Sequence, residues 1–295
     1  MVALTLVLSV FFGKLTCLAA SNNQVTDLAG TTKLTIVHTN DTHARVKWGE
    51  GLGFAKISAI IKEVKRDNPN TLVLDAGDTF HRQTIATLNK GESIALLMNA
   101  IGYDAMVPGN HDFNYGYERL VELNKMTNFP ILAANVRKED GSSLLDAFII
   151  KKIGGLKVGI FGLVTPETIY ATNPKNVEGL TFINPVEAAR LMVEALKNET
   201  DFIIALTHLG MNPSSVFTSI RVAQEVEGID LIIDGHSHTV LEQGLKVGKT
   251  LIVSTGEYSK NLGIVNLYCK TAELSPVRFA SLARTWPQIS QKTRQ

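Results

Sequence analysis

Segments with apolar residues at helical spacing alternate along the chain with short apolar runs. In residues 53–66 the spacing places five apolar side chains on one face of a predicted helix: Phe54, Ile57, Ile60, Ile61 and Val64. Similar patterns predict helices over 91–102, 116–126, 184–198 and 214–226. For the fourth of these, Asn184 followed by Pro185 marks a helix start, because proline fits the first turn.

The apolar runs between these helices predict strands. They cover residues 33–41, 70–78, 129–136, 156–164, 201–210, 229–238, 250–258 and 261–269, and residues 103–112 are predicted as a short strand that leads into a glycine turn. Strands that alternate with amphipathic helices predict an α/β protein. The consecutive strands near the end indicate a mixed sheet or a sandwich.

The two ends of the chain differ from the middle. The first residues are apolar through Phe12 and end in small residues, which predicts a signal peptide over residues 1–20 and export to the periplasm, the cell surface or the medium. No basic residue precedes the apolar run, since Lys14 follows it, and lipid anchoring through Cys17 stays an alternative. Residues 21–32 are a predicted linker, and 269–295 a poorly ordered tail. Removal of the signal would leave only Cys269, so the mature chain would hold no intramolecular disulfide.

The composition and net charge of the chain exclude some classes of function. At 295 residues the chain can bury a core as one large domain or two small ones. A net charge of +1 gives no electrostatic footprint for nucleic acid or for an anionic membrane surface. The N-terminal apolar run is too short for a comfortable membrane span. An anion would therefore have to be bound by a few side chains in one site and not by the overall charge of the chain.

Polar turns follow five of the predicted strands, and five of the seven histidines lie in them: His43, His111, His208, His236 and His238. The strand ends with their turns read "VHTNDTH", "LDAGD", "VPGNHD", "ALTHLG" and "IDGHSH". Ligands of α/β sheets bind beyond the carboxyl ends of the strands, so these turns should converge on one crevice. Each turn also has a structural interpretation: Asp41 and Asp78 could cap helices, Asn110 could serve a left-handed turn, and His208 could be a strand-end histidine.

Aspartate and asparagine oxygens, histidine nitrogens and no sulfur suit Mn, Zn, Fe or Co. Two such ions about 3.5–4 Å apart can clamp both oxygens of an in-line phosphoryl displacement and lower the pKa of a bound water. The five turns, in this order, resemble the calcineurin-like metallophosphoesterases. The phrases "LDAGDTFH", "LMNAIGYDAMVPGNHDFNYG" and "GIDLIIDGHSHT" resemble the exported 5′-nucleotidase branch in particular, over about residues 33–268.

The resemblance implies a four-layer α/β/β/α sandwich over residues 33–268 and two divalent ions. One ion would bind Asp41, His43, Asp78 and His238. The second would bind Asp78, Asn110, His208 and His236, with Asp78 as the bridge. The resemblance leaves His111 to face the substrate, with Asn110 beside it. Arg82 is a further candidate substrate contact, because an arginine beside the crevice could clasp a phosphate, or it could crowd a turn that prefers glycine. Asp234 has no counterpart in the family's ligand set and is expected to support its turn. His38 is expected in the packing and His81 at the pocket.

The chain departs from the family at three places. Asn114 stands where many relatives have an aspartate that pairs with the catalytic histidine, and Arg82 stands where glycine is common. An asparagine can orient an imidazole but supplies no charge to stabilise its protonated form. The chain also stops near the end of the metal domain, so we expect either that the C-terminal nucleoside-binding domain of full-length relatives is absent or that the chain is a fragment of a longer protein.

The resemblance implies a dimetal phosphohydrolase in which a metal-bound hydroxide attacks a nucleoside 5′-monophosphate in line. One alternative on the same metals is a 2′,3′-cyclic nucleotide phosphodiesterase or UDP-sugar hydrolase. A second is a catalytically weak, metal-bound binding protein. A nucleotide or another phosphate ester is the expected partner in each case.

Overall fold

Two six-stranded sheets form the centre of the structure, a computed structural model that describes residues 16–19, 31–47, 49, 51–270 and 280–285. The first sheet has the order β1-β13-β2-β3-β4, with β14 paired to β13. Its strands are β1 (Thr16–Ala19), β2 (Thr31–Thr39), β3 (Thr71–Asp75), β4 (Ala105–Met106), β13 (Asn261–Lys270) and β14 (Ala280–Thr285). The strands β2, β3 and β4 are parallel, so their carboxyl ends share one edge of the sheet.

The second sheet has the order β11-β12-β10-β9-β7-β6. Its strands are β6 (Phe148–Ile153), β7 (Leu156–Val164), β9 (Phe202–His208), β10 (Leu231–Asp234), β11 (Leu245–Val247) and β12 (Thr250–Val253). The four inner strands are parallel, and the two edge strands are antiparallel to their neighbours. A separate pair joins β5 (Val136–Arg137) to β8 (Thr181–Phe182).

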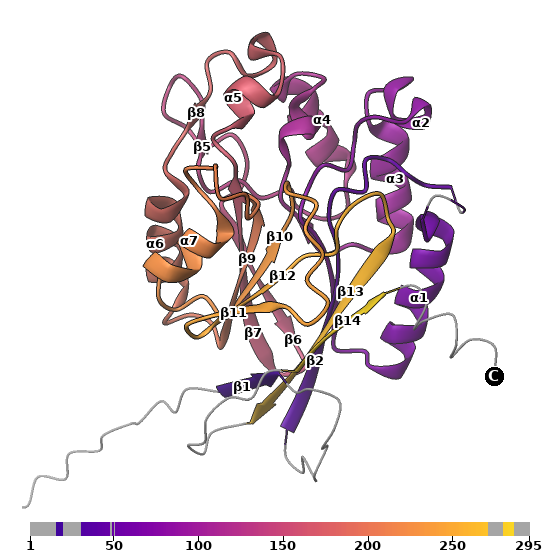
Figure 1. The fold of residues 1–295 in the computed structure, drawn as a ribbon, viewed down its shortest axis with the longest axis vertical. Coiled ribbons are helices and arrows are strands. Elements are labelled where there is room, and N and C mark those ends of the chain that lie inside the picture. The colour runs from indigo at the N-terminus through magenta and orange to yellow at the C-terminus, as the bar shows by residue number, and fades with distance from the viewer. Residues whose placement is uncertain (1–15, 20–30, 48, 50, 271–279, 286–295) are drawn as a thin grey trace, which may run out of the picture.

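Helices cover the outer face of each sheet (Figure 1). On the first sheet α1 (Gly53–Asp67) packs on β3, and α2 (Thr84–Thr87), α3 (Glu92–Ile101) and α4 (Tyr117–Met126) continue this layer. On the second sheet α6 (Pro185–Leu196) packs on β7 and β9, and α7 (Ser219–Glu225) on β10 and β12. The order helix, sheet, sheet, helix confirms the predicted four-layer sandwich. Among the described residues, no helix has both the length and the apolar character to cross a membrane.

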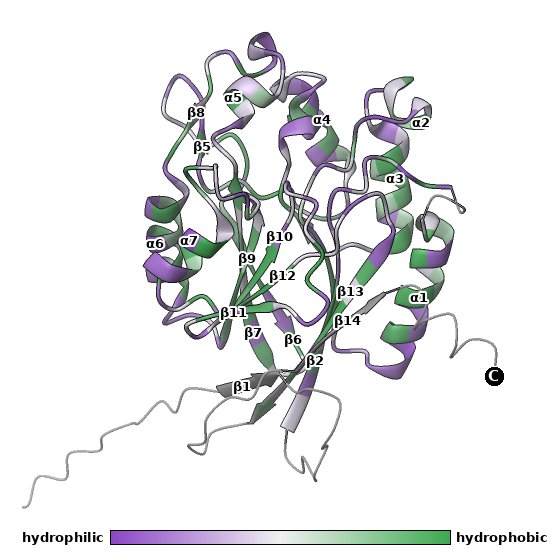
Figure 2. Cartoon of the chain, in the orientation of Figure 1, coloured by the Kyte–Doolittle hydropathy of each residue, from purple (hydrophilic) through white to green (hydrophobic). Residues whose placement is uncertain are grey.

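Alternation along strand β9 shows how one strand serves two cores. Phe202, Ile204 and Leu206 belong to the core between the two sheets. Ile203 and Ala205, which point the other way, belong to the core beneath α6 and α7. A strand that is buried on both faces reads as a continuous apolar run, which is why this segment is strongly apolar in sequence. Figure 2 shows the same contrast, with largely hydrophobic strands β10 and β12 and helices of mixed character.

Most predicted elements match the structure, and α6 begins as its sequence predicts. The Asn184 side chain accepts a hydrogen bond from the backbone N–H of Val186, and Pro185 occupies the first helical position. The strand predicted over 129–136 is wrong, because isolated bridges at Ile131 and Leu132 and the two residues of β5 replace it. The helix predicted over 214–226 is shorter, because α7 begins after Thr218, whose hydroxyl accepts from the N–H of Arg221.

The chain ends contain two strands that the sequence patterns do not indicate. β1 lies within the predicted signal peptide and pairs antiparallel with β13, and β14 lies within the predicted tail. Cys269 is disulfide-bonded in the structure, so a chain free of disulfides applies only if residues 1–20 are removed. The rest of the signal peptide, most of the linker and most of the tail lie outside the described residues.

Candidate active site

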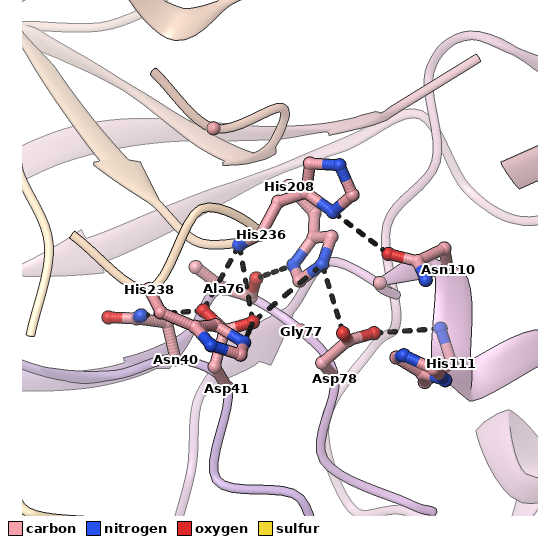
Figure 3. Close-up of polar contacts among 12 residues, drawn as sticks. Asn40, Asp41, Ala76, Gly77, Asp78, Asn110, His111, His208, His236 and His238 are labelled. Atoms are coloured by element: carbon pink, nitrogen blue, oxygen red, sulfur yellow. Dashed lines mark hydrogen bonds and ion pairs between the residues drawn. The ribbon is translucent and has the colours of Figure 1, made fainter. Parts of the chain in front are cut away.

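The carboxyl ends of the parallel strands of both sheets meet in one place. The seven predicted metal ligands lie there: Asp41 and His43 after β2, Asp78 after β3, Asn110 at the start of the 3-10 helix η1 (Asn110–Phe113), His208 at the end of β9, and His236 and His238 after β10. Figure 3 shows six of these side chains turned toward one another, and His43 joins them through its ring nitrogen 3.4 Å from that of His238. The structure therefore brings the whole predicted set together.

Most of these residues have a backbone conformation that side chains disfavour. Positive φ values between 47° and 78° occur at Asp41, His43, Asp78, His236 and His238. Left-handed backbone is uncommon for residues other than glycine, and such strain is concentrated at functional sites. Close approach explains one neighbouring glycine, since a Cβ at Gly109 would collide with the Asp78 carboxylate.

The Asp112 carboxylate fixes the two loops that carry Asp78 and Asn110. It accepts hydrogen bonds of 2.8–2.9 Å from the backbone N–H groups of Asp78, Thr79, Phe80 and Gly109. Burial, together with the charge of Asp78, raises the pKa of Asp112 to about 6, while the backbone donors oppose this shift. Asp112 thus fixes the positions of the two loops relative to each other.

His208 presents a buried nitrogen to two carboxylates. Its Nδ1 lies 2.6 Å from the carbonyl oxygen of Ala76, so this nitrogen carries the proton and donates it. Its Nε2 is buried without a hydrogen-bond partner, 3.4 Å from Oδ2 of Asp78 and 3.9 Å from Oδ1 of Asp41. Beside two carboxylates this nitrogen is stabilised either by a proton of its own or by a cation. Burial lowers the pKa of His208, but the two carboxylates outweigh it and raise the pKa to about 10.

The ligand atoms form two overlapping groups. One atom each from Asp41, His43 and His238 fall within 4.8 Å of one another, and so do atoms from Asp41, Asp78 and His208. Oδ2 of Asp78 lies 3.4 Å from Nε2 of His208 and 3.8 Å from Nε2 of His43. Asp41 belongs to both groups, and Asp78 lies close to a histidine nitrogen of each, where a bridging ligand could lie.

The two histidines of the "GHSH" turn reach the cluster through different nitrogens. Nδ1 of His236 lies 2.9 Å from Oδ1 of Asn110, and its backbone N–H donates to the Asp41 carboxylate. Nε2 of His238 lies 3.4 Å from Oδ1 of Asp41. Asp234 stays outside the cluster, because it accepts from the hydroxyl of Thr207 and supports the turn, as expected.

Asn114 joins two imidazoles at the mouth of the site. Its side-chain nitrogen lies 2.9 Å from Nδ1 of His111 and 3.1 Å from Nδ1 of His81, and its Oδ1 accepts the hydroxyl of Thr172 at 2.7 Å. Because the amide nitrogen donates, both Nδ1 atoms accept, and each neutral ring carries its proton on Nε2. Burial, opposed by the charge of Asp78, lowers the pKa of His111. His81 stacks on His111 and so lies at the pocket, as expected.

Arg82 lies at the rim and not among the ligands. It is exposed, has φ of 107°, and donates from its guanidinium to the hydroxyl of Tyr258 at 2.6 Å. The ring of Tyr258 lies 5.5 Å from that of His43 and 5.8 Å from that of His238. Arg82 is thus directed along the edge of the site. His38, by contrast, is buried in the first sheet opposite Gly263, which confirms a packing role.

Two glutamates at the site escape the sequence patterns. Glu167 lies 3.2 Å from Nε2 of His236, and Glu257 lies 2.7 Å from Nδ1 of His238. Both follow the carboxyl end of a parallel strand, β7 and β12 respectively. The strand-end rule that located the histidines would also have located these carboxylates.

Comparison with known proteins agrees with this geometry. Residues 34–240 match the calcineurin-like phosphoesterase family. The bovine (Bos taurus) 5′-nucleotidase is 33% identical over 261 residues, which cover 80% of this chain and 44% of that protein. The chain therefore spans less than half the length of this relative.

Solved structures share the fold. The calcineurin-like phosphoesterase YfkN from Bacillus subtilis has a TM-score of 0.74 and 27% identity, and covers 90% of this chain and 96% of its own. The NAD nucleotidase from Haemophilus influenzae has a TM-score of 0.71 and 26% identity, and covers 87% of this chain and 50% of its own. On the match to residues 34–240 and the converged ligand set, the chain belongs to the calcineurin-like phosphoesterase family.

Proposed function

We propose that this chain is a dimetal phosphohydrolase that releases phosphate from nucleoside 5′-monophosphates at this site. The observation that carries the proposal is the buried Nε2 of His208, which faces the carboxylates of Asp41 and Asp78 without a hydrogen-bond partner. Because Nδ1 faces the carbonyl oxygen of Ala76, Nε2 is the nitrogen that can bind a cation, and a cation among these three groups would offset the charge of the two carboxylates.

The donor set fits two divalent cations of the Zn, Mn, Co or Fe type, because it combines carboxylate oxygens with imidazole nitrogens and has no sulfur. One would be held by Asp41, His43, Asp78 and His238, and the other by Asp78, Asn110, His208 and His236. When bound, such a pair stabilises the charge on phosphoryl oxygens and lowers the pKa of a coordinated water.

The chain's own groups would then orient the phosphate and the leaving oxygen. The side-chain nitrogen of Asn114 donates to Nδ1 of His111. The neutral ring therefore carries its proton on Nε2, which can act as a donor. We propose that this donor contacts a phosphoryl or leaving oxygen, with the side chain of Asn110 beside it. We further propose that the guanidinium of Arg82 contacts the substrate from the rim.

A neighbouring pocket has room for the rest of the substrate. Its volume is about 370 Å³, within the range of small-molecule sites, and its lining includes Ala44 and Arg45, which directly follow His43. Gln83 and Thr84, next to Arg82, also line it. A basic side chain and polar groups beside a phosphate site suit a nucleotide, the class that the names of the bovine and Haemophilus relatives describe.

The test uses the purified chain, stripped of metal with a chelator and then supplied with Mn²⁺, Co²⁺ or Zn²⁺. We expect metal-dependent phosphate release from AMP that exceeds hydrolysis of 2′,3′-cyclic AMP and of UDP-glucose. Preference for either of the latter would replace the proposed substrate and retain the metal site. Binding of two ions without hydrolysis of any of these, or of p-nitrophenyl phosphate, would overturn the proposal and favour a binding role.

A further inference from the structure

The two histidines after β10 each contact a carboxylate on the side that faces away from the ligand cluster. His238 points Nε2 at Asp41, 3.4 Å from its Oδ1, and points Nδ1 at Glu257, 2.7 Å from its Oε2. His236 does the reverse: Nδ1 lies 2.9 Å from Asn110, and Nε2 lies 3.2 Å from Oε2 of Glu167. An imidazole that donates from one nitrogen has a lone pair on the other. Each glutamate thus leaves the cluster-facing nitrogen free to bind a cation.

Each glutamate contacts the cluster through the outer nitrogen of its histidine, and both are attached to the loops that form the cluster. The residue after Glu257, Tyr258, donates its backbone N–H to the carbonyl oxygen of Asp41 at 2.7 Å. Glu257 is also held on its other oxygen, because Nζ of Lys260 lies 2.7 Å from Oε1. Glu167 directly precedes the short helix α5 (Thr168–Ala171), which packs against η1, where Asn110 lies.

We propose that Glu257 and Glu167 are positioning residues, one for each of the two metal ions of the proposed function. Glu257 would hold His238 as a ligand of the first ion, and Glu167 would hold His236 as a ligand of the second. A carboxylate behind a metal-bound imidazole fixes the proton on the outer nitrogen, orients the ring and increases its basicity. Because His238 is a ligand of one ion and His236 a ligand of the other, each glutamate acts on one ion.

The competing interpretation is an ordinary ion pair at a surface. Both glutamate side chains are 24% exposed, and exposed ion pairs contribute little to stability. That interpretation predicts no change in metal binding when the charge is removed. A positioning role predicts a loss of about 10–100-fold in the affinity for one ion, with the other ion unaffected.

The experiment is a titration of the metal-free chain with Co²⁺, followed by visible absorption and by competition with a chelator. The variants are Glu257→Gln and Glu167→Gln, which keep the shape and an acceptor oxygen but remove the charge, and the corresponding alanine variants. Glu199→Gln, at an exposed glutamate of the α6–β9 connection, is the matched control. We expect each variant to lower the affinity for one Co²⁺ ion by about tenfold or more. The Glu257 and Glu167 variants should affect different ions, and alanine should lower the affinity more than glutamine.

The results separate this inference from the proposed function on which it rests. If the parent chain binds two Co²⁺ ions and both glutamate series bind them as the parent does, the positioning role is wrong and the metal centre stands. Equal loss of both ions in one variant would likewise contradict a role specific to one ion. If the parent chain binds no Co²⁺, the metal centre itself is wrong, and the inference fails with it.

Discussion

The side-chain nitrogen of Asn114 donates to Nδ1 of His111 at 2.9 Å, where an aspartate would instead accept from that nitrogen. The orientation of the amide is set by Thr172, whose hydroxyl donates to Oδ1 of Asn114. The donation disfavours a proton on Nδ1, so it acts in the same direction as burial, which lowers the pKa of His111. This chain therefore keeps His111 neutral by hydrogen bonding as well as by desolvation.

Asn114→Asp should reverse that bias. A carboxylate beside Nδ1 accepts its proton and stabilises the imidazolium, so the pKa of His111 should rise relative to the parent. NMR titration of the His111 ring in the metal-free protein measures this directly. Thr172→Val, which removes only the partner of Oδ1, is the control and should move the pKa less. An unchanged or lower pKa in Asn114→Asp would contradict the donor assignment.

Asp78→Asn should abolish turnover. Oδ2 of Asp78 lies within 4 Å of Nε2 of both His43 and His208, and an amide cannot bridge two cations with two charged oxygens. We expect a fall in kcat/KM beyond the roughly 10–100-fold that residues outside the direct ligands cost. Phosphate release in metal-replete buffer, together with metal content, checks this. Asp67→Asn, on the exposed end of α1, should retain activity. Near-full activity of Asp78→Asn would sink the dimetal assignment.

The positions of the ligands follow from sequence because they depend on one topological rule. Parallel strands place their carboxyl ends together, so polar turns after β2, β3, β9 and β10 had to meet once the strands were identified. The rule needs only the strand pattern and not the side-chain packing. It therefore also predicts the surroundings of Glu167 and Glu257, which stayed unassigned because neither lies in a histidine-bearing turn.

Other features depend on tertiary context that periodicity does not contain. Residues 129–136 are apolar like a strand, but they cross between the sheets, where only Ile131 and Leu132 form isolated bridges. The edge strand β6 has no fully buried residue, so its pattern is weak. The bond between Asn114 and His81 depends on a side-chain conformation that Thr172, far away in sequence, determines. Such contacts carry no local signal in the chain.

The buried carboxyl of Asp75 should make stability depend on pH. Burial raises its pKa from 3.8 to about 7, although Thr39, Thr79 and the N–H of Gly77 donate to it. Between about pH 4 and 7 the unfolded chain loses this proton first, so the folded state binds more protons there. This group therefore lowers stability as pH rises through that window, by at most about 4 kcal/mol, and adds no change above it.

Asp75→Asn removes the titrating group and keeps a similar shape. The pH dependence of stability between about pH 4 and 7 should become flatter in this variant than in the parent. Urea unfolding of the metal-free protein at several pH values within this range measures the effect. Asp67→Asn, whose carboxylate is exposed, should leave the profile of the parent unchanged. Identical profiles for Asp75→Asn and the parent would show that the pKa of Asp75 is the same in the folded and unfolded states.

Arg82 combines backbone strain with a rim contact, and two substitutions separate these effects. Its φ of 107° suits glycine, whereas any residue with a Cβ is strained there. Arg82→Gly and Arg82→Ala both lose the hydrogen bond to Tyr258, but only glycine also relieves the strain. Arg82→Gly should therefore be more stable than Arg82→Ala by about 1 kcal/mol in chemical denaturation. If the guanidinium contacts substrate, both variants should raise KM for AMP by the same factor. A KM equal to that of the parent in both would remove Arg82 from the substrate site and leave the strain comparison intact.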